Sequence, residues 1–309
     1  MNKQEVIHWL LEGDVSIQYQ VWRDLHSIEH KELQSRIGKE GWGAHYLSKR
    51  KPDGHWGLQF YQPKWISTHY TLLDLRNLFL PPDNEMVKES LEFILKTSKA
   101  EDGGIQLGPS TSHRSDVCVN GMFLNYASYF QTEEHKLCSI IDSILGEIMP
   151  DGGFNCRTTR SGAKHSSLHT TISVLEGFEA YLQSNYNYRR DEVNKAKMTS
   201  LDFLLQHQVF LSDKTGKIID PAFLRLTFPS RWRYDILRAL DYFRYAGVVW
   251  DERMHPAIEV LLKKRNKDLT WNLQARHLGQ VHFEMEKAGK PSRWNTLRAL
   301  RVLKHFKMD

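Results

Sequence analysis

Asp151-Gly-Gly-Phe154 is the third copy of a short loop sequence that decides the fold of this chain. Asp53-Gly-His-Trp-Gly57 and Asp102-Gly-Gly-Ile105 precede it, and the aspartates of successive copies are 49 residues apart. Glycine tolerates a positive φ and aspartate accepts hydrogen bonds from its own turn, so each copy is typical of a tight turn. Three turns at one interval, each with a large apolar residue, indicate a structural repeat.

A helical stripe of the form Leu-x-x-(Leu/Phe/Ala) accompanies these turns, with Trp22-Arg-Asp-Leu25 as an early variant. Second helices are predicted between the stripes, over residues 84–98, 135–148, 190–208 and 252–265. Each repeat is long enough for two helices and a loop. We therefore predict an all-α fold, an (α/α)6 toroid of six helical hairpins around a central cavity, in a single domain over residues 1–309. The stripes begin at Trp22, Leu75, Leu124, Leu175, Leu237 and Leu297.

The composition excludes several classes of protein. The chain of 309 residues is 40% hydrophobic and 26% charged, which is typical of a soluble globular protein. A net charge of +5 is too small and too scattered to predict nucleic-acid binding. No apolar stretch approaches the about 18 to 20 residues of a membrane span. Three cysteines are too few for a disulfide framework, so we expect a cytoplasmic protein with free or metal-bound thiols.

Three segments carry a resemblance to a known superfamily: DGGFNCR at 151–157, KHSSLHTTISVLEGF at 164–178 and PSRWNTLRALRVLKHF at 291–306. They resemble terpene cyclases and protein prenyltransferase β subunits, and most closely bacterial squalene-cyclase-like or prenyltransferase-like proteins. The resemblance implies an α/α toroid that binds an apolar, isoprenoid-like ligand, with or without a diphosphate, in its central cavity. The Asp-x-Asp-Asp acid motif of class II terpene cyclases is absent, so a zinc-dependent transferase is the expected enzyme.

The resemblance also implies a zinc site. Prenyltransferase β subunits bind zinc with an Asp-x-Cys pair at one inner-helix start and a histidine at the next, and Asp116-Val-Cys118 and His169 match this pattern. Cys118 and His169 each lie six residues before a stripe, in adjacent repeats. Carboxylate, thiolate and imidazole suit zinc. Cys156 and His165 are further candidate ligands.

Other candidate site residues lie at equivalent places in the repeats. His69 is six residues before its stripe and is a candidate general acid or base, because an unperturbed histidine titrates near neutral pH. Arginines in the loops leading to inner helices are candidates for holding a diphosphate or a carboxylate. The predicted ligand-binding residues are Arg157, Arg231, Trp232, Arg293 and Trp294, and Arg114 and Arg160 lie in similar loops.

Two alternatives stay open. One is a non-catalytic toroid that binds a ligand or a partner, since the separate α subunit of prenyltransferases is not in this chain and any partner subunit is unknown. The other is a polysaccharide-processing toroid, which would normally present paired carboxylates in its cavity. Asp116 and Asp235 lie near inner-helix starts, but in non-adjacent repeats, and this disfavours the second alternative.

Overall fold

The three Asp-Gly loops each tie an outer helix to the next inner helix. The computed structural model describes residues 1–108 and 114–308, without the side chains of Thr159 and Arg160. Asp102 accepts hydrogen bonds from the backbone N–H groups of Gly104 (3.1 Å) and Ser115 (2.8 Å), and Ser115 leads into an inner helix. Asp151 accepts from the N–H of Ser166 at 2.8 Å in the same way. In the second and third copies the aspartate therefore fixes the chain before an inner helix begins, whereas Asp53 accepts from the N–H of His55 within its own turn.

The same loops bind the outer helices through serine. In each copy the first glycine has a positive φ, at +86°, +82° and +90°, and its carbonyl oxygen accepts a hydrogen bond from a serine hydroxyl on an outer helix. The large apolar residue at the end of each copy is fully buried. The first glycine and the apolar residue therefore make the same contacts in all three copies. The serines are Ser90, Ser139 and Ser200, and the apolar residues are Trp56, Ile105 and Phe154.

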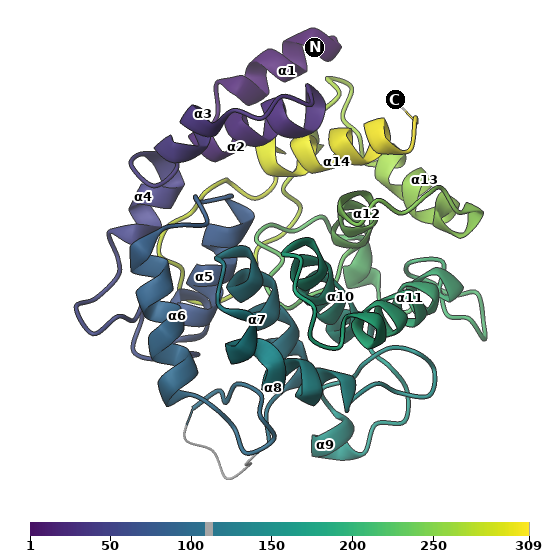
Figure 1. Cartoon of the computed structure of the whole chain (residues 1–309). Coiled ribbons are helices and arrows are strands. Elements are labelled where there is room, and N and C mark those ends of the chain that lie inside the picture. The colour runs from purple at the N-terminus through teal and green to yellow at the C-terminus, as the bar shows by residue number, and fades with distance from the viewer. Residues whose placement is uncertain (109–113, 309) are drawn as a thin grey trace.

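Six inner helices surround the centre of the described structure (Figure 1). Each contains one of the predicted stripes, so the (α/α)6 toroid prediction is confirmed. The first inner helix passes from α-helical into π-helical geometry. The inner helices are α2 (Val15–Gln20) with η1 (Val21–Leu25), α5 (Thr68–Asn77), α7 (Val117–Tyr129), α10 (Leu168–Gln183), α12 (Ile236–Tyr245) and α14 (Arg293–His305).

Outer helices precede the inner ones in sequence and form the outer layer of Figure 1. They are α1 (Lys3–Leu11), α3 (Lys31–Arg36) with α4 (Gly41–Leu47), α6 (Glu85–Thr97), α8 (Glu134–Leu145), α11 (Arg190–Gln206) and α13 (His255–Lys263). Short elements lie in the connections: η2 (Lys64–Ile66), α9 (Thr158–Ser161), η3 (Pro221–Leu224), η4 (Glu252–Met254), and the strands β1 (Trp271–Asn272) and β2 (Pro291–Ser292), which pair antiparallel. Across the described residues, every helix is too short or too polar to cross a lipid bilayer.

Ion pairs close the ring between its first and last inner helices. Arg301 on α14 donates to Asp24 on η1 at 2.7 Å and to Gln20 on α2 at 2.9 Å. The same guanidinium donates to Asp241 on α12 at 2.7 Å. Burial opposes ionisation of Asp24, but Arg301 and Arg23 lower its pKa to about 2. One arginine thus holds three inner helices together.

A long segment, residues 273–290, crosses one end of the ring, and we call it the cap segment. It runs from β1 towards α4 and α5 and returns to β2 (Figure 1). The indole N–H of Trp65 donates to the carbonyl of Leu278 at 2.6 Å, and the ring of Phe283 stacks on His45 at 4.2 Å. The cap segment therefore covers the end where the inner helices begin.

Removing Arg301 is expected to open the ring. In Arg301→Met, Asp24 and Asp241 remain largely buried with one fewer cation between them, so the free energy of unfolding should fall by roughly 3 to 5 kcal/mol. Urea denaturation measures this loss. Arg36→Met removes an exposed pair with Glu40 and should change stability little. Equal stability of the two variants would contradict the role of Arg301.

Candidate functional site

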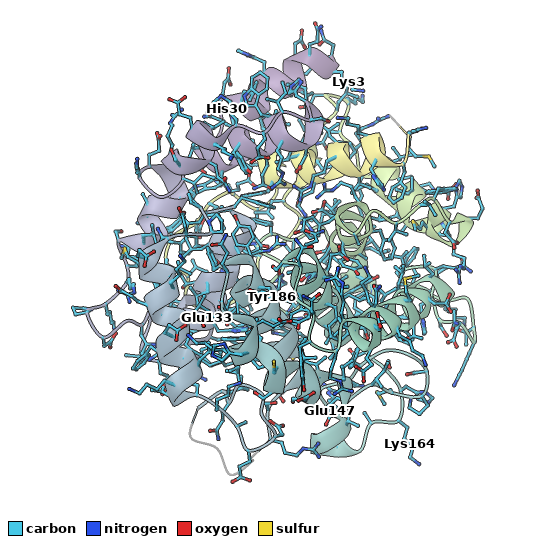
Figure 2. The ribbon with its side chains drawn as sticks, in the orientation of Figure 1. Lys3, His30, Glu133, Glu147, Lys164 and Tyr186 are labelled. Carbon is cyan, nitrogen blue, oxygen red and sulfur yellow. The ribbon has the colours of Figure 1, made fainter. Side chains whose placement is uncertain are left out.

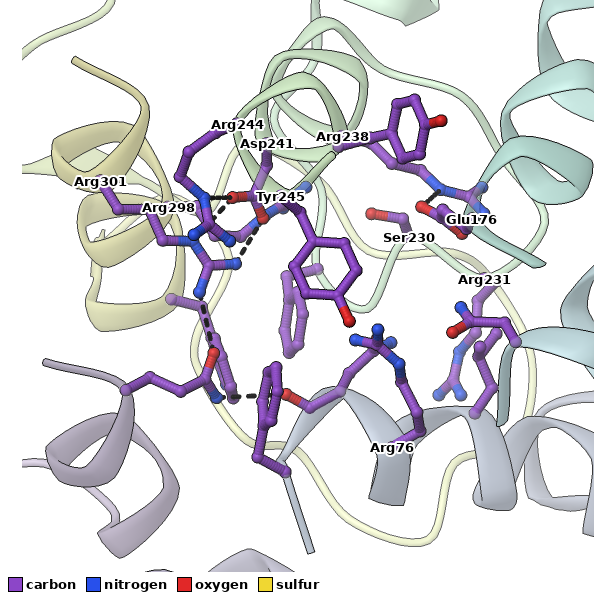
Figure 3. A pocket seen from close by; sticks show the side chains of 18 residues that line it. Arg76, Glu176, Ser230, Arg231, Arg238, Asp241, Arg244, Tyr245, Arg298 and Arg301 are labelled. Atoms are coloured by element: carbon purple, nitrogen blue, oxygen red, sulfur yellow. Dashed lines mark hydrogen bonds and ion pairs between the residues drawn. The ribbon is translucent and has the colours of Figure 1, made fainter. Parts of the chain in front are cut away.

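The centre of the ring is a small polar cavity, which we call the inner cavity. Its volume is about 90 Å³. Figure 2 shows the side chains of the ring as sticks, and Figure 3 shows those that line the cavity. The lining includes six arginines and two carboxylates: Arg76, Arg231, Arg238, Arg244, Arg298, Arg301, Glu176 and Asp241.

One position of the repeat supplies much of this lining. The residue directly after each stripe start faces inward, because the stripe itself packs between the helix layers. Five of these six residues line the inner cavity, and the remaining one, Arg23, pairs with Asp24 at 2.7 Å beside the closure. The signal was present in the sequence as Leu-Arg in three stripes, but sequence reasoning missed it. The five are Arg76, Asn125, Glu176, Arg238 and Arg298.

Ion pairs neutralise most of the cavity arginines. Although burial alone would raise it, Arg301 and Arg244 hold the pKa of Asp241 well below its usual range. Asp74 behaves differently, because burial raises its pKa despite Arg231 and a 2.8 Å hydrogen bond from the Tyr46 hydroxyl. The pairs are Arg231 with Asp74, Arg238 with Glu176, Arg298 with Asp241, and Arg244 and Arg301 with both Asp24 and Asp241.

A second hollow, the outer pocket, lies between the cap segment and the ring. Its volume is about 390 Å³, and Phe228 and Arg231 line both it and the inner cavity. Gly279 packs so closely on Trp65 that a Cβ would lie 2.3 Å from the indole ring. The lining consists of Tyr46, Trp65, Phe228, Pro229, Arg231, Arg276, His277, Leu278, Gly279, Val281, Phe283, Glu284, Met285 and Glu286.

Two histidines of the cap segment are neutral near pH 7. Burial, followed by the charges of Arg233 and Arg231, lowers the pKa of His277 to about 4. Burial and Arg231 do the same for His282, whose Nε2 lies 2.9 Å from the Thr71 hydroxyl. The Nε2 atom of His277 is buried and has no hydrogen-bond partner in the described structure. Sequence reasoning missed both residues, because the cap segment has no periodicity.

The predicted zinc ligands are only partly brought together. The backbone N–H of Cys118 donates to Cys156 Sγ at 3.2 Å, so these two cysteines are neighbours. The Nδ1 of His169 instead accepts a 2.8 Å hydrogen bond from the Tyr234 backbone. No group of three or more His, Cys, Asp or Glu side chains suited to a metal is found among the described residues. The predicted Asp116, Cys118 and His169 site is therefore not assembled, and zinc content itself stays an untested prediction.

The two other predicted histidines differ in exposure. His165 lies in the loop before α10, with its side chain 77% exposed and its Nδ1 4.0 Å from Asp151. His69 is fully buried, with its Nδ1 3.0 Å from the Tyr126 hydroxyl, and burial lowers its pKa to about 3. His69 is thus neutral and out of reach of a ligand in this conformation.

The predicted ligand-binding residues lie in different places, and only two of them line a hollow. Arg231 lines both hollows, and Trp294 lines the inner cavity. Trp232 packs against His169, with ring centres 5.1 Å apart. Arg293 donates to the Trp9 carbonyl at 2.9 Å, and Arg157 is exposed at the start of α9. Of the remaining arginines, Arg114 is exposed and pairs with Glu147, and the side chain of Arg160 lies outside the described residues.

Comparisons with known proteins concern the fold. No protein-family model matches the sequence, and no curated protein matches it. Glycosyl hydrolase family 88 from Bacteroides vulgatus superposes with a TM-score of 0.53 and 12% identity, over 98% of this chain and 97% of its own. A polysaccharide lyase superposes with a TM-score of 0.53 and 13% identity, over 97% of this chain and 95% of its own. The chain shares an α/α toroid fold with both.

These findings correct the expected function. The prediction of a prenyltransferase-like or squalene-cyclase-like protein, including a zinc-dependent transferase, is wrong, because solved structures that share the fold include a glycosyl hydrolase and a polysaccharide lyase. The cavity lining agrees with the correction. An isoprenoid needs an apolar wall, whereas six arginines line the centre of this ring.

Acidification is expected to loosen the cap segment. His277 and His282 have folded pKa values near 4, below the unfolded value of about 6.5. The unfolded state therefore binds more protons between these values, and the stability that neutral histidines contribute is present above about pH 6.5 and lost as the pH falls towards 4. Hydrogen exchange, corrected for intrinsic rates, should show faster exchange in residues 276–286 at pH 5 than at pH 7.

Helix α7 provides the internal control, because its exchange should change less. A double variant, His277→Gln with His282→Gln, should lose the pH dependence of the cap segment. Unchanged protection of residues 276–286 at pH 5 in the parent protein would contradict the expectation.

Proposed function

We propose that this chain binds and processes an acidic saccharide, with the sugar in the outer pocket. The observation that carries the proposal is the outer pocket itself, where aromatic walls meet a buried arginine. Its volume of about 390 Å³ lies within the roughly 300 to 1,000 Å³ that is usual for ligand sites. The fold supports the proposal, because a glycosyl hydrolase and a polysaccharide lyase share it.

The walls of the outer pocket suit a sugar ring. Trp65, Phe228 and Phe283 line it, and aromatic faces pack against the C–H groups of a sugar while leaving its hydroxyls to polar partners. Arg231 stands between the outer pocket and the inner cavity. A guanidinium binds a carboxylate through two parallel hydrogen bonds, so an acid group on the sugar would point towards Arg231.

Trp65→Ala is expected to weaken saccharide binding. Loss of the indole face should reduce the affinity for an oligosaccharide that contains hexuronic acid by about tenfold or more, since a buried aromatic anchor contributes at least about 1.4 kcal/mol. Isothermal titration calorimetry measures the change. Trp250→Ala, beside Phe306 and outside the outer-pocket lining, is the matched control. Equal affinity of both variants for this oligosaccharide would contradict the proposal. So would equal affinity of the parent protein for the corresponding oligosaccharide of neutral hexoses.

Elimination is the reaction that one observation favours. It removes the proton on the carbon next to a sugar carboxylate, forms a double bond to the neighbouring carbon and breaks the C–O bond there, and the leaving glycosidic oxygen takes a proton from water. The step needs an unprotonated base close by. His277 is neutral, and its buried Nε2 has no partner among the described residues. A carboxylate bound at Arg231 would offset part of the positive charge near His277, raise its pKa and make it a stronger base.

The carboxylates around both hollows are less suited to hydrolysis. Glu176, Asp241 and Glu284 are each in an ion pair with arginine. Glu286, whose pKa burial raises, accepts hydrogen bonds from the Ser292 hydroxyl and the Arg293 backbone. Hydrolysis would need one carboxyl group free to donate a proton and a second to act as base or nucleophile.

His277→Gln tests elimination. The variant should bind the acidic saccharide as the parent does, yet lose at least about 100-fold of the rate at which the unsaturated uronate forms, because general-base catalysis contributes about that much. Ultraviolet absorbance of the conjugated double bond follows the product. An undiminished rate in the variant, or a saturated product from the parent protein, would exclude elimination through His277.

A further inference from the structure

The inner cavity holds more positive charge than its carboxylates neutralise. Its six arginines face two lining carboxylates and two more, Asp24 and Asp74, that pair with them from the side. Arg23 also pairs with Asp24. The buried Asp235 interacts with Arg298 and Arg238, so seven cations against five anions leave an excess of two positive charges. Burial and the neighbouring Arg301 lower the pKa of Arg244, as expected where guanidinium groups crowd.

Arg76 accounts for one of the excess charges. Arg76 is 8% exposed, and no ion pair joins it to a carboxylate of the described residues. Its guanidinium instead lies among three aromatic rings, at 5.3 Å from the centre of Phe79, 5.5 Å from Tyr129 and 5.2 Å from Tyr245. Figure 3 shows Arg76 beside Tyr245 in the middle of the group, without a dashed line to an acid.

Two donors of the cavity lining have no acceptor within the described chain. They are Arg76 Nε and the indole nitrogen of Trp294, and both are buried. A buried donor without a partner costs about 1 to 3 kcal/mol. Asn125 also lines the cavity, and its Oδ1 has no donor. Half a turn of this amide would present its two N–H donors instead.

The size of the inner cavity selects a small ligand. A volume of about 90 Å³ is far below the roughly 300 to 1,000 Å³ of sites for larger organic molecules. An ion with several oxygen atoms accepts many hydrogen bonds in little space, and guanidinium groups match its geometry. A sugar ring belongs in the outer pocket, and only a substituent or a free ion fits beside Arg76.

We propose that the inner cavity binds a tetrahedral oxyanion, sulfate or phosphate, with Arg76 as its principal ligand. The oxyanion is either a free ion or an ester group on a ligand that enters past Arg231. This site goes beyond the saccharide pocket and does not depend on it, because a free ion tests the cavity even if no saccharide binds.

Isothermal titration calorimetry of the full chain with sodium sulfate and sodium phosphate tests the proposal, with sodium chloride at matched ionic strength as the reference. The parent protein should give a saturable isotherm with one ion per chain. Arg76→Met keeps the apolar stem among the aromatic rings but removes the charge, and should weaken binding by about tenfold or more. Arg265→Met, at an exposed arginine after α13, should leave the affinity unchanged.

Sulfate stabilises proteins in general, so thermal unfolding is measured in the same salts. The general effect should be equal in the parent and in Arg76→Met, and a site-specific shift should be confined to the parent. If Arg76→Met does not fold, the parent isotherm decides alone: saturation at one ion per chain supports the site, and heats that never saturate overturn it.

The two sources of the oxyanion are separated with glucose 6-sulfate and glucose. Binding of free sulfate that Arg76→Met weakens supports a free-ion site. Binding of glucose 6-sulfate but not of free sulfate or glucose, again weakened in Arg76→Met, supports the ester. Equal affinity of the parent and Arg76→Met for sulfate, phosphate and the ester overturns the proposal. Failure of Trp65→Ala to affect saccharide binding would overturn only the function of the outer pocket.

Discussion

The side chain of Arg301 holds the last inner helix against both of its neighbours in the ring. It pairs with Asp24 on the first inner helix and with Asp241 on the fifth. A contact between the first and last inner helices distinguishes a closed toroid from an open solenoid, because consecutive hairpins alone can form either. Closure brings the inward-facing residues of all six repeats to one point. The arginine-lined inner cavity is therefore a consequence of the ring.

Much of the fold could be predicted from sequence. The Asp-Gly loops are local, and their aspartate, glycine and apolar residues act within one repeat or between neighbours, so they leave a regular spacing. The stripes recur less evenly, every 49 to 62 residues, because each packs one inner helix against its outer layer and the connections differ in length. The cap segment left no such signal. Its position depends on contacts between distant residues, such as Trp65 with Leu278, which sequence spacing does not reveal.

The site was harder to predict than the ring. Equivalent positions at inner-helix starts suggested metal ligands, yet His69 and His169 serve as buried hydrogen-bonding groups, and Cys118 lies against Cys156. Polar residues at these positions form hydrogen bonds with the backbone and side chains around them. The more informative position was one residue beyond each stripe start, because the side chain there lines the inner cavity in five of the six repeats.

The outer pocket and the inner cavity differ in size and in charge, and we propose a different ligand group for each. Aromatic side chains and the neutral His277 line the larger outer pocket, guanidinium groups line the smaller inner cavity, and Arg231 lines both. A crystal structure of the protein soaked with an acidic disaccharide tests this account most directly. The account predicts density for a sugar ring in the outer pocket, with its acid group directed at Arg231. Sugar density outside the outer pocket, or an acid group directed away from Arg231, would contradict it.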